Sequence, residues 1–205
     1  MTEPAVTLTD YGLTLLCAFL VWRARSHVRA DLRPWAMGLF AGSGAAALFG
    51  GTVHGFFGDA ATLGYRVLWP ATILTVGATG LAAWGLGARV GGQATGARWV
   101  TRIAGLAYVA YVAVVLAGWQ AFAVAVAFYL PAVIYLTVRF ALAYRRRPTA
   151  SRRRALIGFG LTFAAAAIQQ LQIPIHPVWF DHNALYHVVQ AAAFVLLFLG
   201  VSGEE

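Results

Sequence analysis

The stretch FDHNALYHVVQAAAFVLLFLGV, residues 180–201, joins a polar, histidine-bearing start to an apolar run. A helix needs about 20 mostly apolar residues to cross the hydrocarbon core of a bilayer. The chain holds seven segments near this length, roughly Leu8–Trp22, Pro34–Phe57, Leu63–Leu86, Val100–Leu116, Trp119–Leu142, Ala155–Leu171 and Asn183–Val201. The sequence therefore predicts an all-α bundle of seven membrane spans forming one domain over residues 1–205. Because only Ala117 and Gly118 separate the fourth and fifth segments, six spans are the alternative.

The composition excludes several classes of protein. Of the 205 residues, 60% are hydrophobic and only 11% charged, whereas soluble domains are about 25% charged. The net charge is +8 and the chain contains no lysine, so it cannot form a retinal Schiff base and is not a microbial rhodopsin. The single Cys17 excludes a disulfide within the chain. The basic residues fall in short loops between apolar segments, which does not indicate nucleic-acid binding.

The arginines predict the orientation in the membrane. They gather in the first, third and fifth loops, whereas the second loop holds Asp59 and the sixth holds no arginine. Loops rich in arginine stay in the cytoplasm. We therefore expect the N-terminus outside and the C-terminus inside, in the plasma membrane of a bacterium. The acidic start of the chain does not resemble a signal peptide, so the first segment is expected to remain as a span.

Ionisable side chains gather on the outer side of this topology. Such residues at membrane depth are costly and are candidates for a functional site. The candidates run from the end of the second span to the start of the seventh: His54, Asp59, Arg66, His176, Asp181, His182 and His187. His27, among the cytoplasmic arginines, is interpreted as a solvated loop residue. Imidazoles and carboxylates at one depth indicate a metal site.

Two helical faces predict how these groups meet. Gly38, Gly42, Ala46 and Gly50 recur at every fourth position and lead to His54. Small residues on one face let another helix approach closely, so His54 is expected to point at a neighbouring helix.

The start of the seventh span has a polar face of its own. Asn183, His187, Gln190 and Phe194 share one helical face, and Asp181 or Asn183 makes a suitable N-cap. His182 is five residues from His187, so it joins this face only by turning back from the cap.

The remaining candidates have weaker roles. Asp59 is expected as a fourth metal ligand or a base, with a solvated loop acid as the alternative. Arg66 is expected to pair with Asp59 or Asp181, or to hold an anionic group. His176, between Pro174 and Pro177, is a candidate lid over the site, because prolines on both sides stiffen the loop.

With these residues in place, the chain resembles the CREST superfamily of seven-span membrane hydrolases, which includes alkaline ceramidases and progestin/adipoQ receptors. Gly50-Gly51-Thr52-Val53-His54 is similar to the family motif that ends the second span, with Gly50 where the family has serine. Asn183-Ala184-Leu185-Tyr186-His187 is similar to the histidine pair of the seventh span, with Asn183 in place of the first histidine. Asp59 comes earlier than the aspartate of the family.

The resemblance implies a zinc-dependent hydrolase of a lipid amide or ester. His54, His182, His187 and Asp59 would hold the zinc ion, and Asp59 and Arg66 would act on the substrate. Asn183, Asp181, His176 and Gln190 would line the cavity. Gly50 and Asn183 favour a second hypothesis, a membrane receptor or binding protein without catalysis. A third is a haem or quinone protein that uses His54 and His187. The expected partners are the bilayer and a lipid substrate or ligand.

Overall fold

The computed structural model of the chain describes residues 1–91, 94–176 and 179–204, and only the backbone at 94 and 95. These residues form seven α-helices and no β-strand longer than a single bridge. The helices are α1 Pro4–His27, α2 Arg33–Phe56, α3 Leu63–Gly87, α4 Ala94–Leu116, α5 Phe122–Arg146, α6 Ala150–Gln170 and α7 His182–Ser202.

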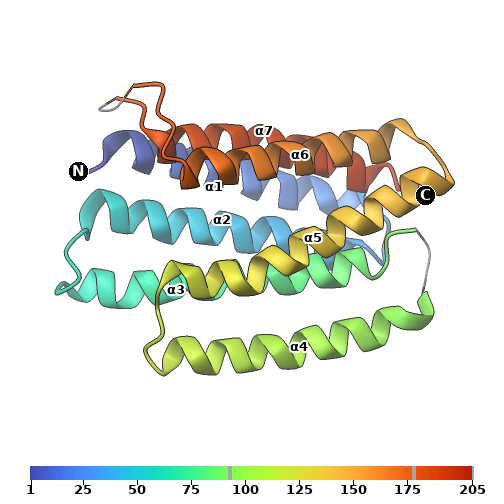
Figure 1. Cartoon of the computed structure of the whole chain (residues 1–205), viewed down its shortest axis with the longest axis horizontal. Coiled ribbons are helices and arrows are strands. Elements are labelled where there is room, and N and C mark those ends of the chain that lie inside the picture. Colours follow the sequence, from blue (N-terminus) through green and yellow to red (C-terminus); the bar gives the residue numbers. More distant parts are fainter. Residues whose placement is uncertain (92–93, 177–178, 205) are drawn as a thin grey trace.

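Successive helices run in opposite directions, and the two termini lie at opposite ends of the bundle (Figure 1). Among the described residues, six helices are long and apolar enough to cross a membrane. The remaining helix, α6, carries three arginines in its first turns and lies beside α7, its main packing partner (Figure 1). The fold is the expected all-α membrane bundle.

A turn separates α4 from α5, at the boundary where the sequence alone left six spans as the alternative to seven. Gly118 has a φ of +100°, a conformation that glycine adopts without steric cost. Trp69 of α3 steadies this turn by donating a hydrogen bond from Nε1 to the carbonyl of Gln120 at 2.8 Å. The fourth and fifth segments are therefore separate helices and are not fused into one span. Six spans nevertheless agree with the six described helices that are long and apolar enough to cross a membrane.

Helix α2 packs closely against its neighbours through glycine. A Cβ placed on Gly42 would lie 2.5 Å from Oγ1 of Thr79 on α3, and one on Gly38 would lie 3.2 Å from Ala82. The stripe that leads to His54 therefore faces α3, as the sequence predicted. A second set of glycines, which includes Gly44, faces α1 at Cys17.

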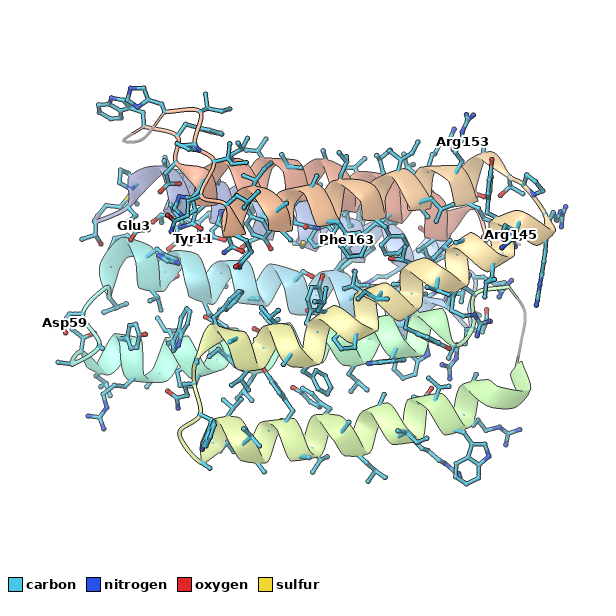
Figure 2. The ribbon with its side chains drawn as sticks, in the orientation of Figure 1. Glu3, Tyr11, Asp59, Arg145, Arg153 and Phe163 are labelled. Carbon is cyan, nitrogen blue, oxygen red and sulfur yellow. The ribbon has the colours of Figure 1, made fainter. Side chains whose placement is uncertain are left out.

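The arginine-rich end differs from the sequence prediction in one respect. Arg145 and Arg146 form the last turn of α5, and Arg152, Arg153 and Arg154 belong to the first turns of α6. The fifth loop is therefore much shorter than expected. Figure 2 shows Arg145 and Arg153 at this end of the bundle, and Glu3 and Asp59 at the other.

One buried ion pair closes the arginine-rich end. Arg152 donates two hydrogen bonds to Glu204, from Nε at 2.6 Å and from Nη2 at 3.0 Å. The same guanidinium donates to the carbonyls of Ala143 and Arg147. Arg152 thereby joins the end of α5, the start of α6 and the segment that follows α7.

Candidate ligand-binding cavity

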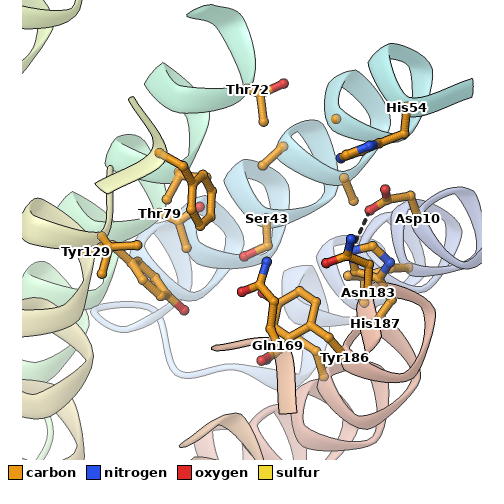
Figure 3. A pocket seen from close by; sticks show the side chains of 18 of the residues that line it. Asp10, Ser43, His54, Thr72, Thr79, Tyr129, Gln169, Asn183, Tyr186 and His187 are labelled. Carbon is orange, nitrogen blue, oxygen red and sulfur yellow. Dashed lines mark ion pairs between the residues drawn. The ribbon is translucent and has the colours of Figure 1, made fainter. Parts of the chain in front are cut away.

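A cavity of about 170 Å³ lies between α1, α2, α3, α5, α6 and α7, in the half of the bundle that holds the N-terminus. Its wall comprises the N-terminal halves of α1 and α7 and the C-terminal half of α2, so it lies away from the arginine-rich loops. Phe122, Val126 and Phe194 give it apolar surface, and Ser43 and Thr79 lie deeper in the bundle. Figure 3 shows the polar side chains converging on this space from different helices.

An aspartate–histidine pair forms one wall of the cavity. Oδ1 of Asp10 on α1 lies 3.1 Å from Nε2 of His187 on α7, and the two side chains are 5% and 11% exposed. Asp10 is six residues past Pro4, which is about 9 Å along the helix. The pair therefore lies inside the bundle, where a charge without a partner would be costly.

The sequence makes room for Asp10 by placing a glycine opposite it. A Cβ on Gly51 of α2 would lie 2.6 Å from the Cβ of Asp10 and 3.2 Å from its Oδ2. Real Cβ atoms do not approach so closely. Gly51 thus lets α1 and α2 come together at the level of the carboxylate and bring it to the cavity.

His54 holds a second, more open pair near the end of the bundle where α1 begins. Its Nδ1 lies 3.1 Å from Oε2 of Glu3, and the side chains are 35% and 46% exposed. The hydroxyl of Thr2 donates to the carbonyl of His54 at 2.7 Å. The start of α1 thus contacts the end of α2, while His54 also lines the cavity.

The polar face of α7 lies as the sequence predicted. Asn183, His187, Gln190 and Phe194 all line the cavity. Gln190 is buried, and its Nε2 lies 3.3 Å from Oγ1 of Thr162 on α6. Asp181 is the N-cap of α7 and accepts a hydrogen bond from the amide of Ala184 at 2.8 Å. Asp181 therefore caps the helix and does not line the cavity.

Several polar groups of the wall have no partner among the residues that the structure describes. The side chains of Tyr129, Gln169, Asn183 and Tyr186 line the cavity, yet they form no hydrogen bond within the described part of the chain. Polar groups inside proteins are nearly always hydrogen-bonded, to protein or to water. These four are therefore available to a molecule in the cavity.

Three other expected site residues lie outside the cavity. Asp59 is exposed in the loop after α2, where its carboxylate accepts a hydrogen bond from the amide of Ala61 at 2.9 Å. Arg66 is exposed on α3 and forms no ion pair with any described residue. His176 is exposed and accepts a hydrogen bond from the amide of Trp179. Its expected neighbour Pro177 lies outside the described residues.

The residues expected to bind zinc do not come together. His54 and His187 share the cavity wall, whereas His182, the first residue of α7, and Asp59 do not line it. Within residues 1–91, 94–176 and 179–204, no three or more histidine, cysteine or acidic side chains are grouped closely enough to hold a metal ion. The expected ligand set therefore does not fit a zinc ion in this structure.

Sequence analysis missed Asp10, the acidic residue at the centre of the site. The residue was assigned to an acidic N-terminus, although it lies in the first apolar segment. The available signal was that Asp10 is the one acidic residue inside any of the seven segments, and such a residue is a functional candidate by default. Glu3 and Thr9 carried no comparable signal, because their roles depend on where α2 and α7 lie.

The chain belongs to a family of unknown function, DUF6962, whose family model matches residues 5–205. The match covers α1 through α7 and includes every helix that lines the cavity. Neither a curated protein nor a solved structure matches the chain.

Proposed function

We propose that this member of the family is a non-catalytic membrane protein that binds a lipid-like molecule through an uncharged polar head. The observation that carries the proposal is the cavity itself, which combines unpartnered hydrogen-bonding groups with apolar wall at membrane depth. Ligand sites typically have this make-up, a mostly apolar lining with a few placed polar groups.

The size of the cavity favours a head group over a whole lipid. Its 170 Å³ would hold roughly five or six water molecules at about 30 Å³ each. Pockets that enclose a drug-sized ligand are larger, about 300–1,000 Å³. A small polar head would fit, and its acyl chain would remain outside the cavity.

The charges on the wall favour an uncharged head over an anionic one. Among the described residues, no arginine lines the cavity, whereas Asp10 does. A phosphate or carboxylate needs arginine, lysine or several backbone amides as donors. The open groups are instead two amides and two phenols, on Asn183, Gln169, Tyr129 and Tyr186, which suit hydroxyl or amide groups.

The arrangement of α5 and α6 suggests the route of entry. Figure 1 shows the two helices close together at the arginine-rich end and separated toward the outer end. Phe122, Val126 and Tyr129 on α5 and Gln169 on α6 line the cavity where the helices have diverged. We propose that the ligand enters here from the outer leaflet, with its chain between α5 and α6.

A thermal-shift panel on purified protein tests the proposal. We would compare three amphiphiles whose hydrocarbon chains have the same length, namely a monoacylglycerol, a fatty acid and an alkylammonium. We expect the monoacylglycerol to raise the melting temperature and the fatty acid to leave it unchanged. Asn183→Leu should abolish the rise, whereas His182→Gln, just outside the cavity, should preserve it. A rise with the fatty acid alone would overturn the proposal.

A metal-dependent lipid hydrolase remains the second candidate. The observation that favours it is that Asp10, His54 and His187, one carboxylate and two imidazoles, line a single cavity. These are the side-chain types that catalytic zinc uses, although in the described part of the chain no three of them are grouped closely enough to hold the ion. Hydrolysis of a labelled ceramide-like lipid, lost in His187→Ala and unaffected by Asp59→Asn, would favour this candidate over the binding protein.

A further inference from the structure

The hydroxyl of Thr9 lies between two backbone carbonyls of α1 and the ring of His187. Oγ1 of Thr9 lies 2.9 Å from the carbonyls of both Ala5 and Val6, one turn earlier in α1. It also lies 3.1 Å from Nδ1 of His187. A hydroxyl has one hydrogen and two lone pairs. When its hydrogen is donated to one of the backbone carbonyls, the hydroxyl offers a lone pair to His187, and a proton on Nδ1 completes the contact.

Nε2 of His187 then faces Asp10 with a lone pair when the ring is neutral. Oδ1 of Asp10, 3.1 Å away, is also an acceptor when the carboxyl is ionised. Two acceptors at this distance repel each other unless a hydrogen lies between them. The contact therefore requires a proton held between Nε2 and Oδ1, or a donor supplied by another molecule.

Helix α1 and its cap also engage His54, the second histidine of the cavity wall. Nδ1 of His54 faces the carboxylate of Glu3 at 3.1 Å, and an ionised carboxylate can only accept. Nδ1 of His54 is thus also the donor. Glu3 and Thr9 belong to the cap and second turn of α1, so one short segment engages Nδ1 of both histidines.

We propose that Thr9 is a positioning residue that holds His187 as its Nδ1–H tautomer, so that Nε2 faces Asp10 with a lone pair and the two groups share one hydrogen. The Asp10 carboxyl supplies this hydrogen when no ligand is bound, and a donor on a ligand can replace it. In the cavity, this pair would accept a hydroxyl or amide hydrogen of the ligand head. That last step rests on the proposed function, whereas the tautomer does not, because it is set by contacts within the protein.

Nitrogen NMR of the ligand-free protein, labelled with ¹⁵N-histidine, tests the tautomer directly. Protonated and unprotonated ring nitrogens have well-separated shifts, and His187→Gln assigns the signals. With the ring neutral, we expect the proton on Nδ1. Thr9→Val keeps the shape of the side chain but removes the acceptor, so the proton should move to Nε2 and face Asp10. Thr9→Ser should restore the wild-type pattern.

Three outcomes would overturn this inference. They are a neutral His187 with its proton on Nε2 in the wild type, a Thr9→Val spectrum with the proton still on Nδ1, and a ring that stays doubly protonated at every pH at which the protein is folded. If Thr9→Val does not fold, the wild-type spectrum still tests the inference, because a neutral His187 with its proton on Nε2 would overturn it without the variant. Because no ligand is present, failure here is distinguishable from failure of the proposed function, which the thermal-shift panel measures.

Discussion

Oδ1 of Asp10 lies 3.1 Å from Nε2 of His187, and this contact joins α1 to α7 inside the bundle. Both side chains are nearly buried, and α1 and α7 pack against each other along this region. The pair therefore contributes to the stability of the bundle as well as to the polarity of the cavity. The two contributions can be separated by comparing unfolding with ligand binding.

Removing one partner of this pair should destabilise the protein strongly. We expect Asp10→Ala and His187→Ala each to lower the free energy of unfolding by about 3–5 kcal/mol, because the remaining group is left buried without its partner. The double variant should lose less than the sum of the two. Unfolding in mixed detergent micelles, followed by circular dichroism, measures these values. Additive losses would show that the pair is not coupled.

The closeness of α1 and α2 at Gly51 should make this position intolerant of a methyl group. We expect Gly51→Ala to cost about 1–3 kcal/mol, since overpacking forces neighbours to move and Asp10 is the neighbour in question. Gly105→Ala on α4 is the matched control, because a Cβ there meets nothing within 4 Å. The control should be neutral or slightly stabilising. Equal effects of the two substitutions would contradict the packing described here.

The buried pair of Arg152 and Glu204 should anchor the end of the chain. Glu204→Gln keeps the shape but leaves the guanidinium without its charge partner, and we expect a loss of about 3–5 kcal/mol. Asp31→Asn, at the exposed ion pair with Arg29, should change the stability by less than about 0.5 kcal/mol. Chemical unfolding of the three proteins under one condition gives the comparison. A small effect of Glu204→Gln would mean that the tail is not anchored.

Metal analysis separates the two candidate functions. For a binding protein we expect well below one zinc per chain in protein purified without chelators, and no change in His187→Ala. One zinc per chain, lost in His187→Ala and retained in Asp59→Asn, would contradict that expectation. It would move the assignment to the hydrolase, with Asp10 in place of Asp59 beside the two histidines.

The sequence predicted the fold because membrane helices are encoded in long apolar segments. The seven expected segments match the seven helices to within a few residues, except at charged ends such as Arg152–Arg154, which continue the helix beyond the apolar part. The glycine stripe and the polar face of α7 were also predictable. Both follow from helical periodicity alone, which is a local property of the chain.

The site was predicted only in part, because which residues belong to the cavity wall depends on which helices are neighbours. His54, His187, Asn183 and Gln190 were placed correctly by periodicity. Asp59 lies in the exposed loop after α2, outside the cavity, and a one-residue step on a helix turns His182 off the face of Asn183. The role of Asp10 rests on contacts with Gly51 and His187, far away in the sequence.

Native mass spectrometry of the protein released from lipid nanodiscs tests the central claim most directly. We predict one bound lipid of an uncharged class per wild-type chain. Tyr129→Phe/Tyr186→Phe should lose it, because both phenolic hydroxyls of the cavity wall are gone, whereas Tyr11→Phe, whose hydroxyl lies 3.1 Å from Thr52 outside the cavity, should retain it. A wild-type protein without bound lipid, or one with the same lipids as the double variant, would contradict the account.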